Sequence, residues 1–98
     1  VDYNKLQALS KLKDALPLDN LSKKFAAFNC NCTEIKNGHN FLSIIKSFKK
    51  IKKNNKPNVI IAHTTKGKGV SIMEGVPSWH YWQGMTKDQI EKTREELV

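Results

Sequence analysis

The sequence PNVIIAHTTKGKGVSIMEGVPSWH, residues 57–80, decides how this chain folds. Residues 59–62 form an apolar run shortly after a proline, which is typical of a buried β-strand. The run leads into Lys-Gly-Lys-Gly at residues 66–69, where glycines let the backbone approach an anion and lysines supply positive charge. A tryptophan and a histidine follow at residues 79–80. Taken alone, Lys-Gly-Lys-Gly could be a solvated hairpin, but the whole string predicts a ligand site at a strand end.

Outward from this stretch, helical and strand-like patterns alternate along the chain. Apolar residues at helical spacing predict a helix over residues 18–28. Alternation of apolar and polar residues predicts a short strand over residues 30–36. A further helix is predicted over residues 41–53, with Asn40 as its cap. Residues 11–16 are expected to be a polar connector.

The last predicted helix has a capping box at its start, because Thr86 is followed three residues later by Gln89. We expect this helix to run through Leu97. Alternation of helices and strands predicts an α/β fold with a mostly parallel sheet, and no linker divides the chain. Ligands collect outside the carboxyl ends of strands in such sheets, so the loops at residues 2–7 and 65–80 are expected to converge on one site.

The net charge of +8 comes from 17 lysines and arginines against nine acidic residues. Six of the lysines lie between residues 46 and 56. The helix predicted in the same region carries apolar residues on one face: Phe41, Leu42, Ile44, Ile45, Phe48 and Ile51. We therefore interpret the lysines as the opposite, solvated face, with a nucleic-acid-binding helix as the alternative.

Chain length, apolar runs and cysteine spacing indicate how large the folded unit is and in which compartment it is expected. The 98 residues suffice for one small domain or for a piece of a larger one, and a start at Val1 without a methionine favours a piece. No apolar run approaches the roughly 18 residues needed to span a membrane, and a cytoplasmic location is expected. Cys30 and Cys32 lie two residues apart in a predicted strand, so they share a face and are interpreted as free thiols.

The stretch at residues 57–80 resembles the end of the thiamine-diphosphate domain of transketolases, most closely the separately encoded N-terminal subunit of many bacteria and archaea. The matching segments are residues 1–7, 62–64, 66–71, 73–74 and 79–80, and together they bracket roughly the whole chain. The resemblance implies a parallel-sheet thiamine-diphosphate-binding fold, of which residues 1–98 would form the C-terminal part. The family's upstream Gly-Asp-Gly motif, which supplies another metal-binding carboxylate, is absent from this chain.

The resemblance also implies which residues hold the cofactor and its metal ion. The side-chain carbonyl of Asn4 and the main-chain carbonyl of Leu6 would be ligands of Mg²⁺ or Ca²⁺, which prefer oxygen. Lys66 would lie near the diphosphate of thiamine diphosphate and neutralise its charge. Gly67 and Gly69 would let the loop fold tightly beside the cofactor.

His80 matches the histidine that the family places between cofactor and sugar substrate. There it would hydrogen-bond substrate oxygens and assist proton transfer, as an imidazole can near neutral pH. The family usually has glycine after this histidine, whereas this chain has Tyr-Trp-Gln-Gly at residues 81–84. Tyr81 is expected to change the loop or narrow substrate access. A structural role is expected for His63.

The implied activity is transfer of a two-carbon ketol unit from a ketose phosphate to an aldose phosphate. It implies sugar-phosphate substrates, a separate C-terminal, pyrimidine-binding subunit, and a homodimer, with the isolated chain inactive. A deoxyxylulose-phosphate synthase-like enzyme is the nearest competing interpretation, because it shares the glycine-lysine loop and a following histidine. Two further hypotheses are a small basic nucleic-acid-binding module, which we regard as disfavoured, and a truncated coding sequence without activity.

Overall fold

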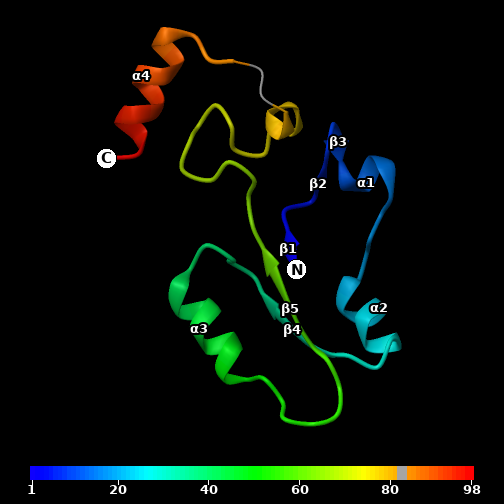
Figure 1. Ribbon diagram of the computed structural model, residues 1–98. Coiled ribbons are helices and arrows are strands. Elements are labelled where there is room, and N and C mark those ends of the chain that lie inside the picture. Colours follow the sequence, from blue (N-terminus) through cyan, green and yellow to red (C-terminus); the bar gives the residue numbers. More distant parts are fainter. Residues whose placement is uncertain (82–83) are drawn as a thin grey trace. The chain divides into compact units, whose positions relative to one another are not determined.

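A computed structural model describes residues 1–81 and 84–98 of the chain (Figure 1). The chain forms two compact units, each built from two segments. We call Val1–Asn4 with Leu18–Thr64 the sheet unit, and Lys5–Pro17 with Thr65–Val98 the loop unit. This division differs from the single unit expected from the sequence, because the chain passes between the units without any change of composition that would mark a linker.

The sheet unit is built on three parallel strands, β1 (Asp2–Tyr3), β4 (Asn31–Ile35) and β5 (Asn58–His63). Their order in the sheet is β1-β5-β4, so the strand predicted from the apolar run lies in the centre (Figure 1). Ile61 of β5 and Ile35 of β4 are buried there. The predicted parallel α/β sheet is confirmed.

Two helices, α2 (Leu21–Ala27) and α3 (Phe41–Lys49), belong to the sheet unit. Asn20 caps α2, so that helix begins three residues later than the predicted start. Asn40 caps α3 as predicted, and its side chain accepts a hydrogen bond from the Ser43 amide at 2.8 Å. Helix α3 ends before the predicted residue 53, because Asn58 forms hydrogen bonds with the main chain of residue 52.

The face that α3 turns to the sheet is not the one that the apolar pattern indicated. Ser47 is 3% exposed, whereas Phe41 is 80% and Phe48 is 59% exposed. Helical periodicity identifies which residues share a face, but not what lies against that face. The expected solvation of the lysines holds for Lys46 and Lys49, which are both exposed.

The loop unit contains a short hairpin of β2 (Leu6–Gln7) and β3 (Ser10–Lys11), followed by α1 (Leu12–Ala15). The prediction of a polar connector over residues 11–16 is therefore wrong. Nothing in the sequence indicated α1, because a helix of four residues is too short to show a periodic pattern. The unit also contains the 3₁₀ helix η1 (Pro77–His80) and α4 (Lys87–Glu96). The predicted capping box of α4 is present in full.

No helix among residues 1–81 and 84–98 has the length and apolar character needed to cross a membrane.

Cys30 and Cys32 are both free, as expected. The Cys32 thiol lies 3.4 Å from the main-chain oxygen of Ser22 in α2.

Any larger residue in place of Gly38 is expected to destabilise the fold, because the space around it is filled. Its amide donates a 2.7 Å hydrogen bond to the His63 carbonyl, so two backbones meet here without room for a side chain. A Cβ atom at residue 38 would lie 2.7 Å from a methyl carbon of Thr64 and 2.9 Å from the His63 oxygen. We expect Gly38→Ala to lower the free energy of unfolding, measured with urea, by about 1–3 kcal/mol.

Gly75→Ala is the matched control. Gly75 has a positive φ of 68°, but among the described residues no atom lies within 4 Å of a Cβ built there. Alanine at residue 75 therefore adds backbone strain alone, about 1 kcal/mol. Equal losses in the two variants would contradict the close contact at residue 38.

Candidate functional site

The two loops singled out by the sequence leave the sheet from neighbouring strands. Tyr3 of β1 pairs with His63 of β5 in a parallel register, so Asn4 and Thr64 emerge at the same edge. The Thr64 amide donates a 3.4 Å hydrogen bond to the Tyr3 carbonyl, and its hydroxyl donates to the Asp2 carboxylate. This edge holds the carboxyl ends of the strands, where parallel sheets bind ligands.

Asn4 and Leu6, the predicted metal ligands, flank the residue at which the chain leaves the sheet unit. That residue is Lys5, whose backbone is left-handed with φ of 62°. This conformation is uncommon for residues other than glycine, asparagine and aspartate. Its carbonyl accepts a 2.9 Å hydrogen bond from the Leu12 amide. Both Asn4 and Leu6 also make interactions within the chain.

The described residues contain no group of three or more histidine, cysteine, aspartate or glutamate side chains able to hold a metal ion. Asn4 and Leu6 offer an amide and a main-chain carbonyl instead, which are oxygen donors of the kind that Mg²⁺ and Ca²⁺ accept. Both the metal ion and its ligands stay predictions.

The Lys-Gly-Lys-Gly segment forms a closed loop. Gly67 and Gly69 have positive φ angles of 74° and 98°. A Cβ atom at Gly67 would lie only 2.6 Å from the Met73 carbonyl oxygen, so glycine is required where the two sides of the loop meet. The Gly75 amide closes the loop with a 2.9 Å hydrogen bond to the Lys66 carbonyl.

Glu74 acts as an anion inside this loop. Its carboxylate accepts hydrogen bonds from the Lys68 amine at 2.9 Å and the Gly69 amide at 3.0 Å. Lys66 is half-buried, and among the described residues no carboxylate pairs with its amine. Of the two lysines in the segment, Lys66 is therefore the one whose charge is available to an external anion.

The end of α4 is held against the same loop. The Glu96 carboxylate accepts hydrogen bonds from the Ser71 amide and hydroxyl, each at 2.6 Å. These bonds favour the charged carboxylate and lower the pKa of Glu96. The Trp79 indole nitrogen donates to the Ile72 carbonyl at 2.9 Å, which ties η1 to the loop.

His80 is the last residue of η1 and is exposed. Its ring meets the Tyr81 ring edge-on, with centroids 4.9 Å apart. Helix η1 lies against β3 of the hairpin that begins at Leu6, so the loop unit brings together segments about seventy residues apart in sequence. Trp82 and Gln83, which complete the unusual sequence after the histidine, lie outside the described residues.

His63 lies on the α2 side of the sheet, beside a cavity of about 290 Å³. Its ring nitrogen is 3.4 Å from the Glu34 carboxylate, and its ring meets the Tyr3 ring edge-on at 5.2 Å. Hydrogen bonds from Ser22 and then from His63 lower the pKa of Glu34. These contacts agree with the structural role expected for His63.

Sequence reasoning missed the carboxylates at these contacts. Glu74 lies in the segment that resembles transketolases, but nothing in its spacing shows that it fills the loop rather than faces solvent. Glu34 and Glu96 gave no signal at all, because their partners lie 29 and 25 residues away.

Removing the internal anion is expected to loosen the loop. In Glu74→Gln, the Lys68 amine loses its charged partner and the Gly69 amide retains only a neutral acceptor. We expect faster hydrogen exchange at the Gly69 amide, with little change in global stability, since exposed ion pairs contribute about 0–1 kcal/mol. Glu91→Gln is the control, because it removes a carboxylate whose ion pair, with Arg94 at 3.3 Å, lies within α4. Unchanged exchange at Gly69 in Glu74→Gln would contradict this role.

Acid is expected to release α4 from the loop. Because the pKa of Glu96 is lower in the folded chain than its ordinary value of 4.5, its contribution to stability is present above that value and is lost as the pH falls through the folded pKa. An NMR titration of the Glu96 carboxyl carbon should give a midpoint below 4.5. In Ser71→Ala the midpoint should move upward, and an unchanged midpoint would refute the assignment.

Comparison with known proteins matches the chain to a family. The family described as transketolase, thiamine diphosphate binding domain, matches residues 2–98. An apulose-4-phosphate transketolase subunit from Actinobacillus succinogenes is 42% identical over 96 residues, covering 98% of this chain and 34% of that protein. The protein of the same name in Phocaeicola vulgatus is 36% identical over 96 residues, covering 97% of this chain and 34% of the relative.

A 6-deoxy-6-sulfo-D-fructose transketolase subunit of a Clostridium species is 36% identical over 80 residues, covering 81% of this chain and 29% of that protein. The chain thus spans about a third of the length of the curated relatives that it matches. Since the family match extends over almost all of the chain, the chain belongs to the transketolase family, within its thiamine-diphosphate-binding domain.

Proposed function

We propose that this chain is part of a split transketolase, whose whole protein transfers a two-carbon ketol unit from a ketose phosphate to an aldose phosphate. The observation that carries the proposal is the exit of two loops from the neighbouring parallel strands β1 and β5. One loop leads through Asn4 to Leu6, and the other leads to Lys66. The carboxyl edge of a parallel sheet is the usual ligand site of such folds.

The residues after β1 fit a site for Mg²⁺ or Ca²⁺. The Asn4 side chain and the Leu6 main chain each offer a carbonyl oxygen, and the left-handed Lys5 between them turns the chain sharply. The neighbouring Lys5 carbonyl is already engaged by the Leu12 amide. Two neutral oxygens do not balance a divalent charge, so the site would need further oxygen ligands, among them a carboxylate.

The loop after β5 fits the diphosphate of the cofactor. Lys66, which no described carboxylate pairs with, would place its positive charge beside it, while Gly67 and Gly69 keep the backbone free of side chains. When bound, thiamine diphosphate supplies the carbon nucleophile of ketol transfer, and the protein supplies orientation and charge. Glu74, which holds Lys68, preserves the shape of the loop before the cofactor arrives.

His80 would act at the substrate. As an exposed imidazole at the end of η1, it can donate a hydrogen bond to a sugar oxygen or accept one from a sugar hydroxyl. Tyr81 meets the edge of its ring and would restrict the directions in which the imidazole can turn.

The remaining parts of the proposal rest on the relatives. All three are named as transketolase subunits, which supports a partner chain. That the partner is the pyrimidine-binding subunit, and that the protein is a dimer, are proposed from the family resemblance. Their names refer to a phosphorylated and to a sulfonated sugar, so we propose a substrate with an anionic group.

Free thiols at Cys30 and Cys32 suit a reducing cytoplasm. A deoxyxylulose-phosphate synthase-like activity is the second candidate, but no observation favours it.

Calorimetric titration of thiamine diphosphate in the presence of Mg²⁺ tests the site on the full-length subunit that carries this chain. Asn4→Ala removes a proposed metal ligand, and we expect the affinity for the cofactor to fall about tenfold or more, corresponding to at least 1.4 kcal/mol. Asn55→Ala is the control, because Asn55 is exposed in the connection after α3.

Thermal unfolding without cofactor should be equal in the two variants, which separates a lost ligand from a lost fold. Cofactor affinity that is unchanged in Asn4→Ala, at equal stability, would overturn the metal-ligand assignment. Absence of any binding by the wild-type subunit would remove the enzyme interpretation.

A further inference from the structure

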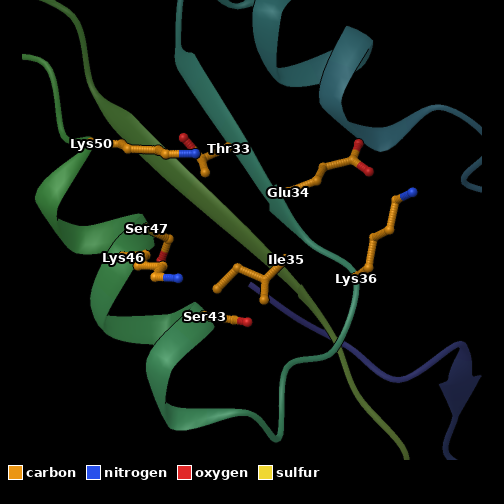
Figure 2. Close-up of a pocket in the computed structure, with 8 residues that line it drawn as sticks. All are labelled: Thr33, Glu34, Ile35, Lys36, Ser43, Lys46, Ser47 and Lys50. Carbon is orange, nitrogen blue, oxygen red and sulfur yellow. The ribbon is translucent and has the colours of Figure 1, made fainter.

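A cavity on the α3 side of the sheet has a lining that favours a negatively charged ligand. It measures about 200 Å³ and lies within the sheet unit, between α3 and β4 (Figure 2). Its lining contains three hydroxyl residues and three lysines: Thr33, Ser43, Ser47, Lys36, Lys46 and Lys50. None of these residues takes part in the cofactor site proposed above.

Small side chains create the space. Ser43 and Ser47 stand one turn apart where α3 faces the sheet, and Ser47 is 3% exposed. The Ser47 hydroxyl donates a 2.7 Å hydrogen bond to the Ile44 carbonyl, which fixes its orientation. Larger residues at these two positions would fill the gap between helix and sheet.

Two lysines direct positive charge toward this space. Lys46 is in α3, and Lys50 follows the helix one turn later, with its amine reaching over the sheet toward Thr33 (Figure 2). Among residues 1–81 and 84–98, no carboxylate forms an ion pair with either lysine. Their charge is therefore not neutralised within the described part of the chain.

The one acidic residue of the lining faces the other way. Glu34 extends toward α2 (Figure 2). Its carboxylate lies 3.4 Å from the His63 ring nitrogen. Lys36 also points away from α3, as alternation along β4 requires. The side chains that face the cavity thus combine two cations with hydroxyl groups and include no carboxylate.

We propose that this cavity binds a small phosphate dianion, either inorganic phosphate or the phosphate group of a small ester. Lys46 and Lys50 would supply charge, and the Thr33 and Ser43 hydroxyls would donate hydrogen bonds. The volume lies below the roughly 300–1,000 Å³ of drug-sized sites and exceeds the approximately 30 Å³ of a water molecule, which suits a small anion. Hydroxyl donors from two elements inside a concave site favour one compact anion over a nucleic-acid backbone.

NMR-monitored titration of the full-length subunit tests the proposal, because it reports on this cavity alone. The amide signals of residues 33, 43 and 47 are followed while inorganic phosphate, and separately glycerol 3-phosphate, is added at constant ionic strength. We expect saturable shifts with both probes. Tighter binding of glycerol 3-phosphate would identify an ester as the ligand, and equal binding would identify the phosphate group itself.

Substitutions then separate a built site from general positive charge. Lys46→Gln and Lys50→Gln should each weaken phosphate binding about fivefold to tenfold, since one charge-assisted hydrogen bond is lost at a partly exposed position. Lys49→Gln and Lys53→Gln remove equal charge outside the lining and should leave the affinity unchanged.

Three results would overturn the proposal. The first is the absence of saturable shifts at residues 33, 43 and 47. The second is an equal loss of phosphate affinity in all four lysine variants. The third is that a DNA duplex shifts these signals, that salt abolishes the shifts, and that all four variants behave alike. The last result would assign the lysines of α3 to a polyanion surface instead.

Discussion

The parallel pairing of β1 with β5 is the constraint on which the rest of the candidate site depends. It fixes Tyr3 beside His63, and so decides that Asn4 and Thr64 leave the sheet together. Residues about sixty positions apart in sequence start from one edge because their strands are paired along the backbone. Thr64 reinforces this arrangement, because its amide and hydroxyl both bond to the segment of β1.

Much of the fold could be predicted from the sequence where a local signal had a local cause. The apolar run before residue 63 is a central strand, and Asn40 and Thr86 cap helices because their side chains reach amides three residues on. Predictions failed where the cause was distant. The hairpin at residues 6–11 and the four-residue α1 are too short to leave a periodic pattern, and the apolar residues of α3 do not reveal which face meets the sheet.

The distribution of apolar residues determines which form of the protein has to be tested. Among the described residues, three hydrophobic side chains are buried, Ile35, Ile61 and Val70, whereas Phe41, Phe48 and others on α3 are exposed. Hydrophobic burial is the main favourable term in folding, at about 25 cal/mol per Å² of apolar surface. The relatives are about three times as long as this chain. Cofactor and phosphate binding should therefore be measured on a form of the protein as long as these relatives.

The Lys-Gly-Lys-Gly loop shows why a motif alone does not assign roles to its residues. Lys66 and Lys68 each precede a glycine, and the motif alone does not show which of them pairs within the chain. The choice is made by Glu74, which lies six residues beyond Lys68 and binds it together with the Gly69 amide. An internal carboxylate in this position competes with any phosphate for the same donors, since both are anions that bind amides and amines. One lysine thus stabilises the loop, and the other keeps a charge that the loop itself does not use.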